Sequence, residues 1–374
     1  MIPKTAFDGA WLRSEARRLN GCDPQLLERC IHALALLGKL QQAGIPLVFR
    51  GGTSLLLHLP VLHRLSIDID ILCPLQGEEL FRALIPIGTS VPFHQWEEHE
   101  RDPTRLPKRR HFKFYFHSAL GVQTQSANCI LLDVVDEPER VHTTERKPIA
   151  TSFLQPETEV LVEVPTLESL LGDKLTAFAP TTTGVPLRKA DGTPGDVMQV
   201  VKQLFDVGTL FASASNGQVI ADTYHKVQAN ESAYRGGIHT AAASLDDTIR
   251  ACLQLTPTQV RTPEKFPDHP LLWDGFTKLR SHLTASIGEN NLRTLAARTA
   301  CLAAHLRAGA TIDLQAMRYS STPEAQTALK QATFKDTEWE WMDKQIKPVN
   351  PEAYHYWQQA IQIPRNKDAA ETVS

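Results

Sequence analysis

Two aspartates separated by one residue are the first feature of this sequence that could do chemistry. Asp68 and Asp70 lie in the stretch RLSIDIDIL, residues 64–72, where apolar and polar residues alternate. Such alternation predicts a strand, and side chains i and i+2 of a strand share a face. The two carboxylates are therefore expected side by side, where they repel each other. A divalent cation that prefers oxygen ligands, such as Mg²⁺, would remove that repulsion.

A Gly-Gly-Thr-Ser segment, residues 51–54, precedes these aspartates. It follows a short apolar strand expected at 45–49, and a helix is expected to begin near Thr53 or Ser54 and to end at Pro60. Gly51 and Gly52 allow the backbone to approach a ligand closely, and the first N–H groups of a helix suit a phosphate. No Lys-Ser or Lys-Thr pair follows, so this is not a Walker A loop. The order predicts a phosphate-binding turn beside a metal site.

This pattern resembles the nucleotidyltransferases of the DNA polymerase β superfamily, and most of all the AbiEii/AbiGii-type toxins. The family shows GG[TS], an apolar helix and Arg-x-Ser-x-Asp-x-Asp. A second block is a helix LESLLGDKLTAF followed by VKQLFDVGTL, in which Gln203 stands where relatives often carry an acid. The resemblance covers residues 47–211. The matching residues are Gly51, Gly52, Thr53, Arg64, Ser66, Asp68, Asp70, Lys174, Lys202 and Asp206.

The resemblance implies transfer of a nucleoside monophosphate from an NTP to an acceptor hydroxyl, with release of pyrophosphate. It implies that Asp68 and Asp70 hold Mg²⁺ and that Lys174 contacts the triphosphate, while Asp206 orients Lys174 or the acceptor. The superfamily often uses a third carboxylate, as metal ligand or general base. Asp133, in CILLDVV, is the candidate. Nucleotide-binding roles are expected for Gly51, Gly52, Thr53, Ser54 and Arg64.

Ser66 lies on the expected aspartate face, and a phosphate there would compete for the cation. Inhibitory modification at Ser66 is therefore a hypothesis.

The acceptor implied by the family resemblance is the 3′ end of tRNA, which would make the protein a toxin with a cognate antitoxin. A segment in which basic and aromatic residues alternate could bind RNA phosphates and bases. Its residues are Arg101, Arg105, Lys108, Arg109, Arg110, Phe112, Lys113, Phe114 and Tyr115. Three alternatives stay open: a small-molecule nucleotidyltransferase acting on an aminoglycoside-like acceptor, a protein AMPylating enzyme, and a non-catalytic binding module. The intact aspartate pair argues against the last.

The composition is that of an ordinary globular protein. The chain has 374 residues, 42% of them hydrophobic, and a formal net charge of −3, which does not favour nucleic-acid binding by bulk charge. No apolar run of 18 residues predicts a membrane helix, and the first residues do not resemble a secretion signal. Six scattered cysteines without a Cys-x-x-Cys pair predict free thiols and a cytoplasmic protein.

The expected fold is α/β (α+β), with a polymerase β-like nucleotidyltransferase core around a mixed sheet, followed by a mostly α-helical domain. The expected domains are 1–164 and 165–374, the second contributing Lys174 and Asp206 to the site. Hydrophobic periodicity and end signals predict the main elements. These are helices at 24–43, 77–88, 167–179 and 197–213, and paired strands at 110–117 and 127–135.

Overall fold

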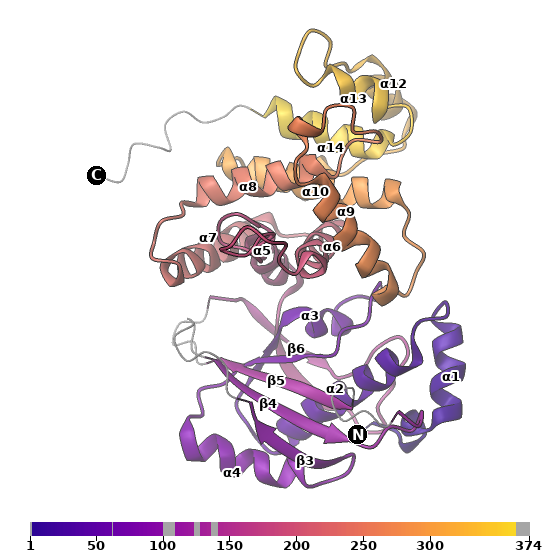
Figure 1. Ribbon diagram of the computed structural model, residues 1–374, viewed down its shortest axis with the longest axis vertical. Coiled ribbons are helices and arrows are strands. Elements are labelled where there is room, and N and C mark those ends of the chain that lie inside the picture. The colour runs from indigo at the N-terminus through magenta and orange to yellow at the C-terminus, as the bar shows by residue number, and fades with distance from the viewer. Residues whose placement is uncertain (1, 62, 100–108, 123–127, 136–140, 364–374) are drawn as a thin grey trace. The chain divides into compact units, whose positions relative to one another are not determined.

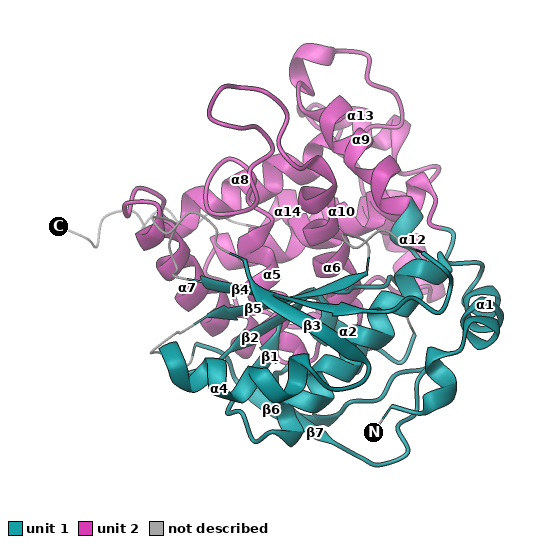
Figure 2. Cartoon of the chain, turned by 60° about the horizontal axis from the view of Figure 1, so that its bottom comes forward, with its two compact units in different colours: residues 1–166, 281–286 teal, residues 167–280, 287–374 magenta. Residues whose placement is uncertain are grey.

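The computed structural model describes all residues except 1, 62, 100–108, 123–127, 136–140 and 364–374. The chain divides into two compact units (Figure 2). Unit 1 comprises residues 1–166 and 281–286, and unit 2 comprises 167–280 and 287–374. The domain boundary expected from sequence lies after residue 164. The sequence does not predict that residues 281–286 belong to unit 1.

Unit 1 is an α/β structure built on a mixed sheet (Figure 1). Its described elements are η1 (Lys4–Phe7), α1 (Gly9–Arg18), α2 (Pro24–Gln42), β1 (Val48–Arg50), α3 (Gly51–Ser54), η2 (Leu55–Leu57), β2 (Ile69–Leu72), α4 (Gly77–Gly88), β3 (Phe93–Glu98), β4 (Arg109–Phe116), β5 (Cys129–Val135), β6 (Thr144–Pro148) and β7 (Leu161–Pro165). The seven strands lie in the order β3-β4-β5-β2-β1-β7-β6. The pairs β2–β5 and β1–β7 are parallel and the others antiparallel. The predicted fold class is confirmed.

The two faces of the sheet differ in character. On β4, Phe112, Phe114 and Phe116 are buried on one face, where Phe116 stacks on His32 of α2 and Phe112 contacts Phe81 of α4. Side chains alternate along a strand, so His111, Lys113 and Tyr115 belong to the opposite face. The helices α2 and α4 thus cover the apolar face, and the polar side chains of β4 belong to the other face.

Two predicted elements near the aspartates are shorter than expected. The helix predicted from Thr53 or Ser54 is a single turn, α3, which begins at Gly51 and continues as the 3₁₀ turn η2. The strand predicted over 64–72 is regular only at Ile69–Leu72. Its first part pairs elsewhere: Arg64 forms a bridge with Leu283, and the Leu65 N–H donates to the His282 carbonyl. This pairing explains why residues 281–286 belong to unit 1.

Unit 2 is built from helices. Its described elements are α5 (Leu167–Ala177), α6 (Val197–Ser213), α7 (Gly217–Tyr234), α8 (Ala241–Gln254), η4 (Pro263–Lys265), α9 (His269–Leu279), η5 (Arg280–His282, ending in unit 1), α10 (Glu289–Arg307), α11 (Leu314–Met317), α12 (Pro323–Gln331), α13 (Glu340–Gln345) and α14 (Pro351–Gln362). The helix α10 packs against α6, α8 and α14, and α5 packs between α6 and α7 (Figure 1). In the described part of the chain, no helix is long and apolar enough to cross a membrane. All six cysteines lie in described regions, are buried and form no disulfide, as predicted.

The long loop between α5 and α6 is anchored by Asp247 of α8. This buried carboxylate accepts hydrogen bonds from the Thr181 N–H (2.7 Å), the Thr181 hydroxyl (2.6 Å) and the Thr182 hydroxyl (3.0 Å). The loop that connects the helix of Lys174 to that of Asp206 is therefore fixed to the helical core.

We expect Asp247→Ala to lower the free energy of unfolding by about 3 kcal/mol, because it removes three hydrogen bonds that a buried carboxylate accepts. Asp246→Ala, at the next position, removes only a half-exposed ion pair with Arg307 and should cost less than about 1 kcal/mol. Thermal or urea unfolding of the two variants measures the difference. Equal losses would contradict the anchoring role of Asp247.

Candidate functional site

The carboxylate of Asp70 lies directly against Gly51. A Cβ atom added to Gly51 would be 2.1 Å from Oδ2 of Asp70, and Gly51 has a φ of +78°, which favours glycine. The contact follows from the sheet register, because Arg50 is paired with Asp70 where β1 leads into the turn. The glycine turn and the second aspartate, predicted from sequence to be neighbours, are in contact.

Gly52 lies close to residues that precede the aspartates. A Cβ atom there would be 2.6 Å from Nη2 of Arg64 and 3.3 Å from the hydroxyl of Ser66. Thr53 donates a hydrogen bond to the Asp68 carbonyl (2.5 Å) and lies 2.9 Å from the Ser66 hydroxyl. These contacts tie the turn to the backbone that carries Asp68.

The side chains of Thr53 and Ser54 are turned inward. Both residues are fully buried, and the Ser54 hydroxyl donates to the Gly51 carbonyl (2.8 Å). A nucleotide at this turn would therefore meet backbone N–H groups rather than the hydroxyls. Ser66 is buried and bonded to Thr53 as well, so its modification would require this packing to open.

Four polar residues form a row across the polar face of the sheet. In register, Arg50 of β1 is paired with Asp70 of β2, Asp70 with Asp133 of β5, and Asp133 with His111 of β4. Paired residues of neighbouring strands project to the same face. The Nδ1 atom of His111 is 2.6 Å from Oδ1 of Asp133, and both side chains are largely buried. Asp133, the predicted third carboxylate, thus lies on the strand next to Asp70.

His111 is absent from the residues singled out in the sequence. A histidine inside an apolar strand is usually a core residue. Whether His111 meets Asp133 depends on the register between β4 and β5. The two strands were expected to pair, and that pairing is confirmed, with Arg109 opposite Val135 and Tyr115 opposite Cys129. Only this register places His111 opposite Asp133.

The oxygen donors suit Mg²⁺ better than a softer metal. Asp68, just before β2, and Asp70 both supply carboxylate oxygens, which Mg²⁺ prefers. Softer metals prefer thiol or imidazole ligands. In the described parts of the chain, no group of three or more His, Cys, Asp or Glu side chains is arranged to hold a metal ion by itself. Mg²⁺ commonly takes only one or two protein carboxylates and fills its other positions with water and substrate phosphates. The residues present therefore fit this ion.

Lys174 and Asp206 form a buried pair within unit 2. Nζ of Lys174, on α5, lies 3.5 Å from Oδ2 of Asp206 and donates to the side-chain oxygen of Gln203 (3.1 Å), both on α6. The exposed fraction is 11% for the Lys174 side chain and 2% for that of Asp206. The spacing of Gln203 and Asp206 puts both on one side of α6. Gln203 thus contacts the lysine directly.

A scan against protein-family models matches residues 35–286, more than half of the chain, to the nucleotidyl transferase AbiEii toxin family of type IV toxin–antitoxin systems. The chain belongs to the AbiEii family. It is a nucleotidyltransferase, and the family implies an NTP substrate and an antitoxin partner. The resemblance stated from the motifs is confirmed. A search of the curated proteins finds no match.

Two solved structures are similar to this AbiEii protein. JHP933 from Helicobacter pylori is 12% identical, with a TM-score of 0.40 and coverage of 81% of this chain and 99% of that chain. A proposed nucleotidyltransferase from H. pylori is 14% identical, with a TM-score of 0.41 and coverage of 78% and 99%.

In the basic and aromatic segment of the AbiEii protein, two of the aromatic side chains are fully buried. Arg101, Arg105 and Lys108 lie outside the described residues. Phe112 and Phe114 have no exposed surface, so the prediction that they stack on bases is wrong. In the folded sheet, these two aromatics belong to the core of unit 1.

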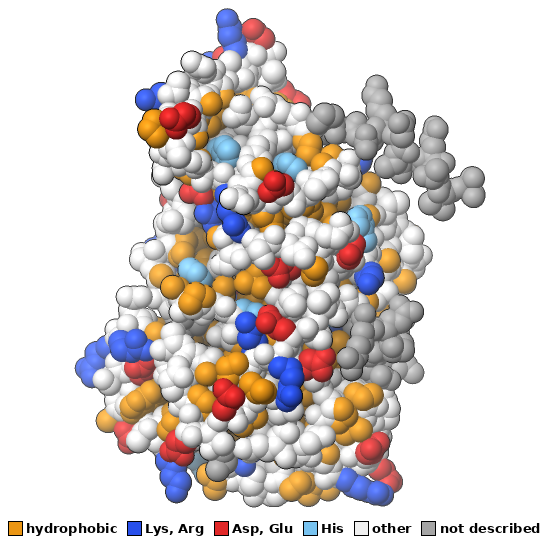
Figure 3. Space-filling model, turned by 180° about the vertical axis from the view of Figure 1, so that it is seen from behind, with side chains coloured by type: hydrophobic (Ala, Val, Ile, Leu, Met, Phe, Trp, Pro, Cys, Tyr) orange, Lys and Arg blue, Asp and Glu red, His pale blue; other side chains and the backbone are white. Residues whose placement is uncertain are grey.

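Arg110, Lys113 and Tyr115 of this segment each pair with an acid on β3. Arg110 binds Glu98 (2.8 Å) and lies over the Phe81 ring, while Lys113 is 3.7 Å from Glu97. The Tyr115 hydroxyl donates to Glu97 (2.7 Å), and burial together with this carboxylate raises the pKa of Tyr115 to about 12. Basic and acidic side chains are also interspersed on the face shown in Figure 3.

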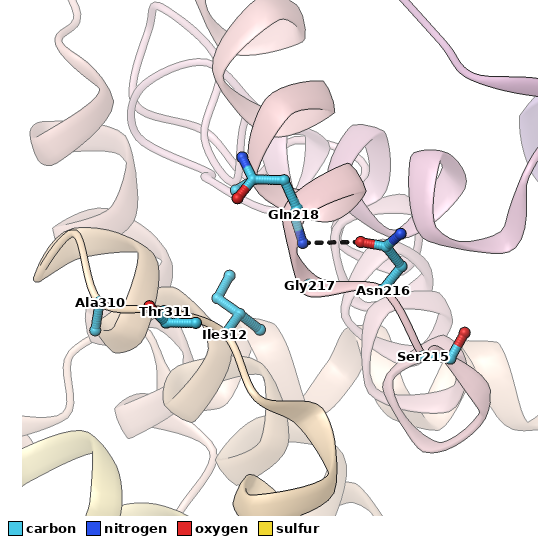
Figure 4. A pocket seen from close by; sticks show the side chains of 8 residues that line it. Ser215, Asn216, Gly217, Gln218, Ala310, Thr311 and Ile312 are labelled. Atoms are coloured by element: carbon cyan, nitrogen blue, oxygen red, sulfur yellow. Dashed lines mark hydrogen bonds between the residues drawn. The ribbon is translucent and has the colours of Figure 1, made fainter.

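A hollow of about 510 Å³ lies in unit 2 at the start of α7 (Figure 4). Ser215, Asn216 and Gln218 line one side and Thr311 and Ile312 the other. The Asn216 side chain accepts the Gln218 N–H (3.1 Å) and so caps the helix. None of the residues predicted to act on the nucleotide lines this hollow.

Proposed function

We propose that this AbiEii toxin transfers a nucleoside monophosphate from an NTP to the 3′ end of tRNA in a Mg²⁺-dependent reaction in the cytoplasm. The contact between Gly51 and Asp70 is the observation that carries the proposal. It brings the helical turn α3 next to the Asp70 carboxylate, and Asp133 is paired with Asp70 on the neighbouring strand β5. This arrangement supports a phosphate site and a metal site close to each other in unit 1.

The residues have distinct tasks in this reaction. The backbone N–H groups of residues 52–54 bind the β- and γ-phosphates, and Arg64 supports the turn through its contact with Gly52. The family motif assigns to Lys174 the task of supplying a positive charge to the triphosphate, and Asp206, 3.5 Å from its Nζ, holds that lysine. Mg²⁺ on Asp68 and Asp70, when bound, neutralises charge that develops on the phosphoryl oxygens.

The transfer itself exchanges one P–O bond for another. The acceptor hydroxyl oxygen attacks the α-phosphorus, and the bond from that phosphorus to the bridging oxygen of pyrophosphate breaks. Asp133 accepts the hydroxyl proton, and pyrophosphate leaves with the electron pair of the broken bond. The location of Asp133 beside Asp70 supports this assignment, because the base must lie near the reacting phosphate.

Incubation with total tRNA, Mg²⁺ and each α-labelled NTP in turn tests the proposal. We expect label in RNA with wild type, and none with Asp68→Asn or after chelation of the metal. Glu79→Gln, an exposed carboxylate in the first turn of α4, is the matched control and should label RNA as wild type does.

The destination of the label decides among the alternatives. Label on protein in place of RNA would favour AMPylation, and label on an added aminoglycoside would favour a small-molecule acceptor. Labelling of RNA that is equal for wild type and Asp68→Asn would overturn the assignment of the aspartate pair.

A further inference from the structure

None of the catalytic roles proposed above uses the hydrogen bond between His111 and Asp133. His111 lies on β4 and is buried, with its Nδ1 atom 2.6 Å from Oδ1 of Asp133. In the tautomer that carries a proton on Nδ1, His111 donates this hydrogen bond and the Asp133 carboxylate accepts it. This hydrogen bond engages Oδ1 of Asp133, and within the described residues no hydrogen bond is made by Oδ2.

Asp133 needs a hydrogen-bond donor that fixes the orientation of its carboxylate, because another carboxylate lies beside it. Asp133 is paired in register with Asp70, so two carboxylates project from neighbouring strands on one face. Their repulsion favours rotation of one side chain away from the other. The strand β4 lies on the other side of β5 from β2. Its His111 donates a hydrogen bond that restrains Asp133 in one orientation.

We propose that His111 is a positioning residue of the transfer reaction: its hydrogen bond to Asp133 fixes the carboxylate that receives the proton of the acceptor hydroxyl. This inference rests on the proposed function. His111 acts through Asp133 and does not touch the nucleotide. Its removal therefore lowers the rate of the chemical step and leaves NTP binding unchanged.

The fold should tolerate replacement of this side chain. The backbone of β4 is paired with β5 along seven residues, and the His111 carbonyl accepts a hydrogen bond from the His99 N–H (2.7 Å). These backbone bonds are independent of the imidazole. A ring of similar size, as in His111→Phe, fills the same space without the donor.

Two variants at His111 separate positioning from packing. With total tRNA as acceptor, we expect His111→Phe to lower kcat about 10-fold and to change the KM for NTP less than about twofold. His111→Asn should recover most of the loss, because its side-chain amide can donate from nearly the same place. Thr144→Val is the control: it removes another cross-strand hydrogen bond to a carboxylate, Thr144 to Glu163 (2.6 Å), and should leave kcat unchanged.

The decisive comparison uses Asp133→Asn. This variant should lower kcat about 100-fold, and adding His111→Phe should cause no further loss, because His111 acts only through the lost carboxylate. A further 10-fold loss in the double variant, or failure of His111→Asn to recover activity, would overturn the proposal.

Growth arrest on expression supplies a second readout that requires no knowledge of the acceptor. It should weaken in His111→Phe and return in His111→Asn. Absence of RNA labelling by wild type would refute the proposed function by itself. The order of the His111 variants in growth arrest would then still support or refute the positioning role.

Discussion

Gly51→Ala should lower nucleotide transfer about 100-fold or more, although it adds only one methyl group. The new Cβ would lie 2.1 Å from Oδ2 of Asp70, so this carboxylate must move by more than about 1 Å to reach an ordinary contact distance. A shift of that size at a reacting group can cost about two orders of magnitude in rate. Initial rates of RNA labelling at saturating NTP measure the effect.

Gly44→Ala is the control that isolates the contact from the backbone strain. Gly44 has a φ of +73°, close to the +78° of Gly51, but an added Cβ would meet nothing within 4 Å. Both variants carry the cost of about 1–2 kcal/mol for a left-handed conformation. Only Gly51→Ala disturbs Asp70. If both variants lose stability equally and both keep full activity, the position of Asp70 beside the turn is not required for transfer.

The elements that sequence alone predicts best are those with local determinants. The helix α4 has the predicted bounds, Gly77–Gly88, and so does α6, Val197–Ser213. The helix α2 begins at Pro24 as predicted, directly after Asp23, whose side chain accepts the Gln25 N–H and so caps it. In each case, periodicity and end signals lie within the segment itself, so no distant partner is needed to define it.

The features that the sequence does not reveal depend on distant pairing. The predicted strand at 64–72 loses its first residues because His63 and Leu65 bond to residues 282–284, more than 200 positions away. The pattern RLSIDIDIL cannot distinguish this partner from a neighbouring strand. His111 is missed for the same reason, since its role depends on a register that no local signal fixes. The motif residues can be recognised from sequence because their spacing is local. The residues that hold them, such as His111, cannot, because they are distant in the chain.

Lys174→Met should lower kcat/KM for NTP by about 100- to 1000-fold, the loss expected when one charged donor to a developing negative charge is removed. Lys174→Arg keeps the charge, but its larger planar head should not fit beside Asp206 and Gln203, so we expect it to remain well below wild type. Steady-state kinetics with varied NTP measure both variants. Wild-type kinetics in Lys174→Met would remove this lysine from the reaction.

The buried pair allows stability and activity to be separated. Asp206→Leu leaves the Lys174 charge buried without its carboxylate, and should cost about 3–5 kcal/mol of unfolding free energy. Adding Lys174→Met removes that charge, so the double variant should unfold within about 1 kcal/mol of wild type. Its transfer activity should nevertheless stay as low as that of Lys174→Met. If the stable double variant were also active, the pair would serve the fold of unit 2 alone. A stable and inactive double variant instead assigns the pair to the reaction, because the loss then has no folding cause.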